Sequence, residues 1–106
     1  MAQEISLTDA HQQWASDDAP VFVDIRDPQS FAQAHIPGAV AINNDNVGEF
    51  IQATDSDQIV IVVCYHGISS QQASDILQHN GLKNAASMQG GFTAWQLQFP
   101  DDVAAS

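Results

Sequence analysis

The sequence contains very little positive charge and almost no cysteine. Thirteen acidic side chains are set against only two basic ones, Arg26 and Lys83, which gives a formal net charge of -11. Such a charge repels nucleic-acid phosphates and anionic lipid headgroups, so neither is expected as a partner. The single cysteine, Cys64, cannot form an internal disulfide, and no Cys-x-x-Cys pair is present to build a zinc site or a dithiol centre.

Long apolar segments and metal-ligand patterns are also missing. The longest apolar run, Ile59 to Cys64, is far shorter than the roughly 20 residues of a membrane-spanning helix, and no basic and apolar leader opens the chain. The four histidines are widely separated, so no metal site is expected: they are His11, His35, His66 and His79. These absences favour a soluble protein of the reducing cytoplasm, with no membrane partner.

The residues that are present suit one compact domain. Hydrophobic residues make up 44% of the 106, enough to bury a core, and no repeat or linker-like segment interrupts them. We therefore expect a single domain over residues 1–106, with frayed ends near 1–3 and 101–106.

Strand-like and helix-like segments alternate along the chain. Val21 to Ile25 and Ile59 to Cys64 are β-branched runs without alternation, which predicts strands buried on both faces. Shorter strands are expected around Ile5, at Ala39 to Ile42 and at Ala85 to Met88. Apolar residues at helical spacing lie between and after them: Leu7, Ala10 and Trp14; Val47, Phe50 and Ile51; Ala73, Ile76 and Leu77; Phe92, Trp95 and Phe99. This alternation predicts an α/β fold, with a mostly parallel sheet and helices on both faces.

Proline and glycine mark where several of these elements begin and end. Pro37-Gly38 is typical of a turn that leads into the strand at Ala39. Pro100 is expected to end the last helix. Gly90-Gly91 would let the backbone pass close to another element.

The segment from Cys64 to Ser70 joins the strongest strand to a well-marked helix. Cys64 is therefore expected at the carboxyl end of a strand, where open α/β sheets bind ligands. Ser69 with Gln72 three residues later has the pattern of a capping box, which predicts the start of the helix, and Gly81 predicts its end. Gly67 can adopt unusual dihedral angles, so the N–H groups of the loop can converge on an anion.

Such a loop changes the chemistry of a cysteine. Its thiol ordinarily has a pKa of about 8.5, and the helix dipole and converging N–H groups lower that value. We predict that Cys64 is mostly thiolate at neutral pH. A thiolate there can attack the outer sulfur of a donor, and the same N–H groups can hold the terminal sulfur of the resulting persulfide. Without this context, a cysteine that ends a core strand is more often a small buried hydrophobic residue.

The residues around Cys64 allow more than one interpretation. His66 could assist proton transfer or could simply face solvent. Tyr65 could line the mouth of a pocket or pack against the end of the strand. Ser69 and Ser70 are interpreted as helix-capping residues rather than nucleophiles, because neither has an identifiable base, although their hydroxyls could touch a bound anion.

A charge pair is expected near the end of the first long strand. Asp24 follows the buried residues Val21 to Val23 and precedes Arg26 by two positions, which favours a structural ion pair beside the cysteine loop. The aromatic residues Phe92, Trp95 and Phe99 are interpreted as a core face rather than a binding platform.

Four groups of residues together resemble the rhodanese family. They are Val-Asp-Ile-Arg at 23–26, Phe31 with His-Ile-Pro-Gly-Ala at 35–39, the loop from Cys64 to Ser69, and Gly-Gly-Phe at 90–92 with Trp95. The resemblance extends over nearly the whole chain. The chain is similar to the single-domain thiosulfate sulfurtransferases of the GlpE type. It implies a three-layer rhodanese fold with a five-stranded, mostly parallel sheet.

The resemblance also implies an activity and the residues that carry it. The donor would be thiosulfate, and the acceptor cyanide, a small thiol, or a dithiol such as thioredoxin, with no cofactor beyond a covalent persulfide. Cys64 matches the residue that forms this persulfide. The positions that match the anion-binding loop are Tyr65, His66, Gly67, Ile68 and Ser69, with Ser70 next to them, and Asp24 and Arg26 match positions that support the site.

The sequence departs from the family pattern in two places. Ala34 stands where a glycine is common, and Gln71 and Gln72 follow the double serine where a lysine is frequent. Because the loop itself holds no basic residue, the charge of a substrate would have to be met by backbone N–H groups alone.

Two other functions use similar residues. A cysteine phosphatase or an arsenate reductase also needs a thiolate in an anion-binding loop, but it adds an arginine six residues after the cysteine, where this chain has Ser70. A rhodanese-fold module could instead accept or relay a persulfide from a protein partner without turnover. The presence of Cys64 favours catalysis over a purely binding role.

Overall fold

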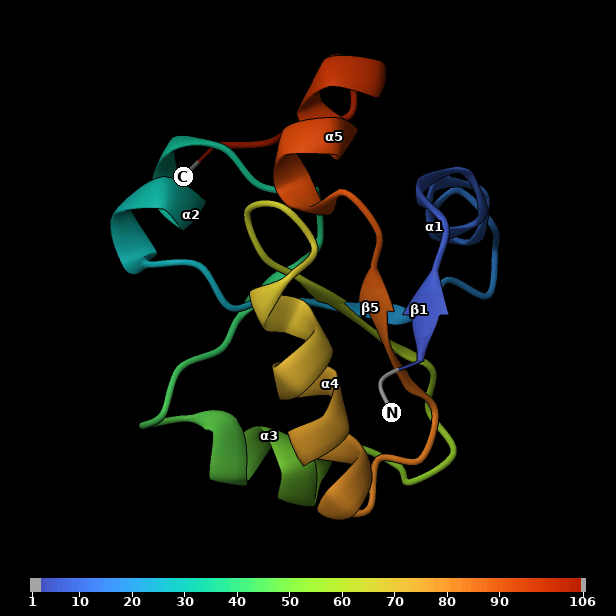
Figure 1. Cartoon of the computed structure of the whole chain (residues 1–106), viewed down its shortest axis with the longest axis vertical. Coiled ribbons are helices and arrows are strands. Elements are labelled where there is room, and N and C mark those ends of the chain that lie inside the picture. The colour runs from blue at the N-terminus through green and yellow to red at the C-terminus, as the bar shows by residue number, and fades with distance from the viewer. Residues whose placement is uncertain (1–2, 106) are drawn as a thin grey trace.

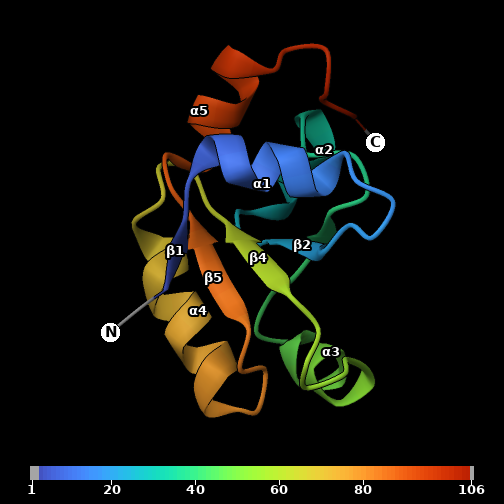
Figure 2. The same cartoon turned by 90° about the vertical axis from the view of Figure 1, so that its right-hand side faces the viewer.

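All five predicted strands form, and they make one sheet in which every pair of neighbouring strands runs parallel (Figures 1 and 2). The computed structural model describes residues 3–105. The order across the sheet is β1-β5-β4-β2-β3, which confirms the predicted α/β fold class. The strands are β1 (Glu4–Ile5), β2 (Val21–Asp24), β3 (Val40–Ala41), β4 (Val60–Val63) and β5 (Ala85–Met88).

Five helices connect and cover the strands. They are α1 (Leu7–Trp14), α2 (Pro28–Gln33), α3 (Val47–Ala53), α4 (Ser69–His79) and α5 (Gly91–Gln98). Four of them were predicted from apolar spacing, and Pro100 follows the end of α5 as expected. None of the helices within residues 3–105 has the length and apolarity needed to cross a bilayer.

Helix α2 was not predicted, because it has only six residues and none of them is buried. No apolar periodicity therefore marks it. Its start is encoded locally: the Asp27 side chain accepts a hydrogen bond from the Ser30 N–H (2.9 Å), and Pro28 occupies the first turn. An Asp-Pro pair of this kind is the signal that could have identified it.

Strand β4 has apolar side chains on both faces because the sheet is covered on both sides. Ile61 and Val63 belong to the core beneath α1 and α5, together with Trp95. Val60 and Val62 belong to the core beneath α3 and α4. Figure 2 shows the sheet between these two layers of helices. This two-sided burial explains the absence of alternation in the sequence.

The register of the sheet brings the ends of its central strands together. Asp24, the last residue of β2, pairs with Val63 of β4 and with Ala41 of β3. The Ile25 N–H then donates to the Val63 carbonyl (3.0 Å). The residues that follow β2 and β4, including Cys64, therefore lie at the same edge of the sheet.

Parts of the two ends that were expected to fray make main-chain contacts with the domain. Residues 101–105 fold back onto the domain, where His35 and Ala104 form an antiparallel bridge with hydrogen bonds of 2.9 and 2.8 Å. At the other end, the Gln3 carbonyl accepts from a β5 N–H (2.8 Å). These main-chain bonds hold both segments in place, and sequence patterns give no sign of them. The remaining terminal residues lie outside the described part of the chain.

Candidate active site

Cys64 is the first residue after β4, and its sulfur lies in a ring of hydrogen-bond donors. The residue is buried, with 4% of its surface exposed. Its Sγ accepts from the N–H groups of Gly67 (3.1 Å) and Ser70 (3.3 Å), and it lies 3.1 Å from the Ser70 hydroxyl oxygen. That hydroxyl is 2.6 Å from the hydroxyl of Ser87 on β5. The loop therefore does curl its N–H groups inward, as its glycine and its position predicted.

This surrounding lowers the pKa of Cys64. Burial alone raises the pKa of the thiol, because the charged thiolate loses contact with water. Hydrogen bonds from the Ser70 side chain and from the backbone N–H groups of Ser70, Gly67 and His66 act in the opposite direction and outweigh burial. The direction of the shift agrees with the prediction, since donors aimed at the sulfur favour its anionic form.

The amino end of α5 holds the cysteine loop in place through hydrogen bonds to its backbone. The Phe92 N–H donates to the Cys64 carbonyl (2.8 Å), and the Thr93 N–H donates to the Tyr65 carbonyl (3.1 Å). Contact this close requires glycine. A Cβ on Gly91, which has a φ of +62°, would lie 2.5 Å from the Tyr65 carbonyl group. This confirms the prediction that the Gly90-Gly91 pair lets the backbone approach another element.

The prediction that Ser69 and Ser70 cap helix α4 is wrong. Helix α4 begins at Ser69, its N-cap position is Ile68, and no side chain makes a capping hydrogen bond there. Ser70 is fully buried and turned toward Cys64, so the cysteine sulfur accepts the N–H that a capping side chain would otherwise bind. The predicted end of the helix at Gly81, which has a φ of +102°, is correct.

Three loop side chains lie at the surface around the buried sulfur. His66 is exposed, Ile68 is 74% exposed and Tyr65 is 43% exposed. The Tyr65 ring therefore lies at the rim of the site rather than in the core. The outward position of His66 agrees with the interpretation in which it faces solvent.

Tyr65 is held at the rim by residues that the sequence analysis did not single out. Its hydroxyl donates to the Asp27 carboxylate and lies 2.8 Å from the Ser30 hydroxyl. The hydrogen bond from Tyr65, followed by those that the Ser30 N–H and hydroxyl donate to Asp27, lowers the pKa of Asp27 to about 2. Asp27 and Ser30 belong to the start of α2, so the helix that lacked an apolar pattern positions part of the site.

Asp24 and Arg26 form a buried ion pair, as predicted. Their side chains are 1% and 5% exposed, and Arg26 donates two hydrogen bonds to Asp24 Oδ2, at 2.8 and 3.1 Å. Arg26 also donates to the Ala34 carbonyl (2.6 Å), and its guanidinium lies 4.2 Å from the centre of the Phe92 ring. The pair therefore connects the end of β2 to α2 and to the start of α5.

Neither basic side chain offers a free charge to Cys64. Arg26 is neutralised by Asp24, and Lys83 pairs with Asp57 (2.7 Å) near the amino ends of β4 and β5, at the opposite edge of the sheet. The two departures from the family pattern also have a structural explanation. Gln71 donates to the Gly67 carbonyl (2.9 Å), and Ala34 has an extended backbone that any residue can adopt.

Comparisons with known proteins identify the family of this chain. A family model for the rhodanese-like domain matches residues 7–98. A rhodanese-like domain protein from Staphylococcus aureus is 25% identical, with a TM-score of 0.78 over 88% of this chain and 90% of that one. A protein of unknown function from Rhodopseudomonas palustris, described as a possible tyrosine phosphatase, is 29% identical, with a TM-score of 0.74 over 92% and 81%.

A third structure shows the fold alone. It is a rhodanese-like domain from Anabaena, 18% identical, with a TM-score of 0.80 over 100% of this chain and 81% of that one. The family model covers most of the chain, and the parallel sheet places a cysteine loop at the carboxyl end of β4. The chain therefore belongs to the rhodanese-like domain family, a family of the sulfurtransferase type.

Proposed function

We propose that this protein is a thiosulfate sulfurtransferase, of the single-domain GlpE type, that forms a persulfide on Cys64. The observation that carries the proposal is the buried sulfur with N–H donors at 3.1 and 3.3 Å and a hydroxyl at 3.1 Å. Such donors stabilise negative charge on sulfur without a metal or a bound cofactor. The acceptor would be cyanide, a small thiol, or a dithiol such as thioredoxin.

The first half-reaction loads the cysteine. The Cys64 thiolate attacks the outer sulfur of thiosulfate, a new S–S bond forms, and the original S–S bond breaks. Sulfite leaves with the electron pair, and Cys64 now carries a terminal anionic sulfur. The N–H groups of Gly67 and Ser70 donate to Sγ, so they favour the anionic, nucleophilic form of the attacking sulfur.

The second half-reaction transfers the terminal sulfur from Cys64 to the acceptor. The carbon of cyanide, or the sulfur of a thiolate, attacks the terminal sulfur, and the bond to Cys64 breaks with its electron pair returning to Sγ. Thiocyanate or a new persulfide leaves, and the same donors receive the regenerated thiolate.

Intact-mass measurement after treatment with thiosulfate tests the proposal. The wild type should gain the mass of one sulfur atom, cyanide should remove it, and Cys64→Ser should gain nothing. A wild type that stays unloaded, or a Cys64→Ser variant that loads equally, would exclude Cys64 as the sulfur carrier.

The second candidate is a module that accepts or relays a persulfide from a protein partner. It is favoured by Ile68, an aliphatic side chain that is 74% exposed on the loop beside the sulfur and could contact a partner. Thiosulfate-dependent formation of thiocyanate that is lost in Cys64→Ala would rule out a purely binding role. A phosphatase is less well supported, because the position of its arginine is taken by the buried Ser70.

Added inert salt should raise kcat/KM for thiosulfate. The donor is a dianion, the chain carries a net charge of -11, and both basic side chains are paired with carboxylates. Raising the ionic strength from about 0.01 M to about 0.15 M shortens the Debye length from about 30 Å to about 8 Å and screens the repulsion. The reaction of Cys64 with a neutral thiosulfonate is the control, and its rate should not change. If kcat/KM for thiosulfate instead falls steeply as salt is added, the potential at the entrance to the site is locally positive.

Ser70→Ala should shift the pH dependence of sulfur loading toward higher pH. The rate should rise as the Cys64 thiol ionises and level off above its pKa. Losing the Ser70 hydroxyl removes one of the groups that lower this pKa. A hydrogen bond to a charged group is worth about 1.5 kcal/mol or more, so loading below the inflection should slow roughly tenfold.

Ser74→Ala is the matched control for this variant. Ser74 is also fully buried on α4, one turn beyond Ser70, but within the described residues its hydroxyl has no hydrogen-bond partner. Removing the Ser74 hydroxyl should leave the inflection in the pH dependence of sulfur loading unchanged. If both variants move the inflection alike, the effect comes from the packing of α4 and not from the hydrogen bond to sulfur.

A further inference from the structure

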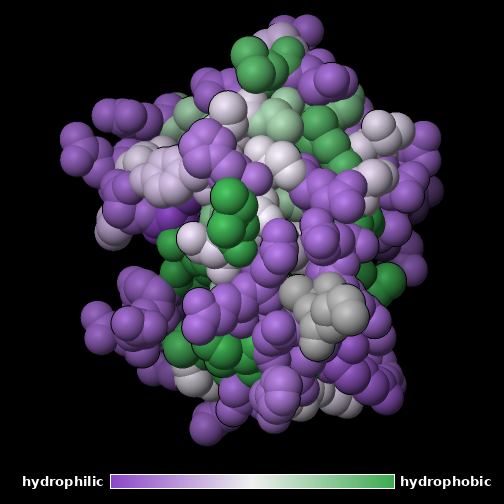
Figure 3. Space-filling view, in the orientation of Figure 1, coloured by the Kyte–Doolittle hydropathy of each residue, from purple (hydrophilic) through white to green (hydrophobic). Residues whose placement is uncertain are grey.

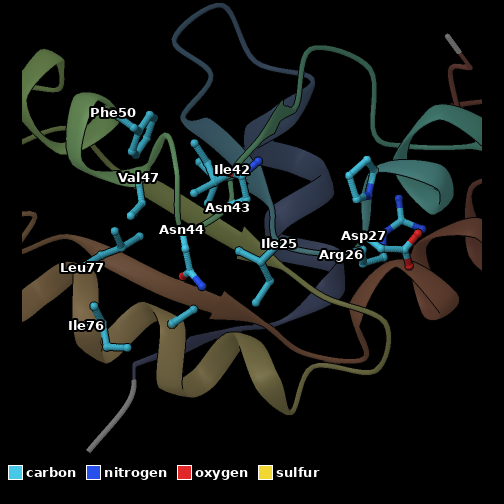
Figure 4. Close-up of a pocket in the computed structure, with 13 residues that line it drawn as sticks. Ile25, Arg26, Asp27, Ile42, Asn43, Asn44, Val47, Phe50, Ile76 and Leu77 are labelled. Carbon is cyan, nitrogen blue, oxygen red and sulfur yellow. The ribbon is translucent and has the colours of Figure 1, made fainter.

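An apolar cleft lies beside the candidate site, between α3, α4 and the carboxyl ends of β2 and β3 (Figure 4). Its volume is about 550 Å³, within the range of small-molecule sites. Figure 3 shows apolar surface in a hollow between the part of the molecule that carries α2 and the part that carries α3. The apolar lining includes Ile25, Ile42, Val47, Phe50, Ile76 and Leu77.

One end of the cleft is joined to the cysteine loop through Asp27. Arg26 and Asp27 line that end, Asp27 accepts from the Tyr65 hydroxyl, and the Arg26 guanidinium lies 5.7 Å from the centre of the Tyr65 ring. The cleft then continues along α4, where Ile76 is the seventh residue after Ser69. At 1.5 Å per residue, Ile76 lies about 10 Å along the helix from the loop.

The charges at the cleft disfavour an anionic occupant, and its apolar lining favours an uncharged one. Arg26 is paired with Asp24, so its charge is not free, and Asp27 is a carboxylate whose pKa is lowered to about 2. The other polar lining residues, Asn43 and Asn44, are neutral. An anionic group placed here would meet Asp27 and the field of a chain with a net charge of -11.

We propose that this cleft binds the body of the sulfur acceptor, and that the preferred acceptor is an uncharged organic thiol with an apolar body about 10 Å long. The inference rests on the proposed function. With the body between α3 and α4, the thiol group lies at the cysteine loop. Its sulfur bonds to the terminal sulfur of the Cys64 persulfide, the bond to Sγ breaks, and the thiol proton ends on the new persulfide while Cys64 leaves as thiolate.

Two thiols with the same phenylbutyl body test the acceptor class. 4-Phenylbutane-1-thiol is neutral, and 4-(4-mercaptobutyl)benzoate adds one carboxylate at the far end, where it does not alter the basicity of the thiol. The neutral thiol should discharge the persulfide with a kcat/KM roughly tenfold higher. Equal rates for the two thiols would overturn the proposal.

A pair of charge-matched variants locates the binding surface. Ile76 lines the cleft and is 50% exposed, whereas Leu97 on α5 is 79% exposed and is not among the residues that line it. Ile76→Glu should slow discharge by the neutral thiol roughly tenfold and leave discharge by cyanide unchanged. Leu97→Glu, which adds the same charge, should change neither. If both variants slow discharge by the neutral thiol, or if Ile76→Glu also slows discharge by cyanide, the acceptor does not bind in the cleft.

Binding without sulfur chemistry separates this inference from the proposed function. 4-Phenylbutan-1-ol has the same body as the neutral thiol but no sulfur. Isothermal titration calorimetry should show that it binds saturably to the wild type and to Leu97→Glu, and more weakly to Ile76→Glu. If the alcohol binds in this way but Cys64 never loads, only the proposed function fails. If Cys64 loads but the alcohol does not bind, the cleft does not hold this acceptor, and a protein segment becomes the better occupant.

Discussion

Gly91→Ala should lower the free energy of unfolding by about 3 kcal/mol or more, because it combines backbone strain with a steric clash. Gly91 has a φ of +62°, and its new Cβ would lie 2.5 Å from the Tyr65 carbonyl carbon and oxygen and 2.6 Å from the Cys64 carbonyl oxygen. These are backbone atoms, which cannot rotate away. The clash would push the cysteine loop from α5 and weaken the hydrogen bond from Phe92 to the Cys64 carbonyl.

Gly81→Ala separates strain from clash in this experiment. Gly81 also has a positive φ, +102°, but nothing lies within 4 Å of its Cβ position. Its substitution should therefore cost only the strain, about 1 kcal/mol. Urea denaturation of both variants, with the slopes compared to the wild type, measures the difference. Equal losses would show that the loop and α5 separate more easily than their contacts indicate.

The sequence predicted the sheet well because its central strands are buried on both faces. Runs such as Ile59 to Cys64 leave few alternatives to a core strand, and the helix positions followed from apolar spacing. Helix α2 and the fold-back of residues 101–105 were not predicted. Both depend on capping and on single contacts, such as the bridge between His35 and Ala104, that leave no periodic pattern.

The candidate site was predicted only where its parts are neighbours in the chain. The position of Cys64, the curl at Gly67 and the lowered pKa all follow from a strand, a glycine and a helix in sequence. Ser70 was misinterpreted because its partner is the sulfur rather than the helix end. Ser87 lies on a neighbouring strand, so only the assembled sheet shows its contact with Ser70.

Asp24→Ala should also lower the free energy of unfolding strongly, because Asp24 pairs with Arg26 in the interior of the assembled fold. The substitution leaves the Arg26 guanidinium buried, with the Ala34 carbonyl and the faces of Phe92 and Tyr65 as its remaining partners. Removing one member of a buried pair costs about 3–5 kcal/mol, because the other charge remains without compensation. That is a large share of a total stability of about 5–15 kcal/mol. Asp57→Ala, which breaks the exposed pair with Lys83, should leave stability nearly unchanged.

A double variant, Asp24→Leu with Arg26→Met, tests whether charge is the cause. It removes both charges and keeps apolar volume at the end of β2, so it should recover most of the stability that Asp24→Ala loses. Urea denaturation of the wild type, the single variant and the double variant gives the comparison. If the double variant is no more stable than Asp24→Ala, the hydrogen bonds from Arg26 to Asp24 and Ala34 hold β2, α2 and the start of α5 together, and an apolar pair cannot replace them.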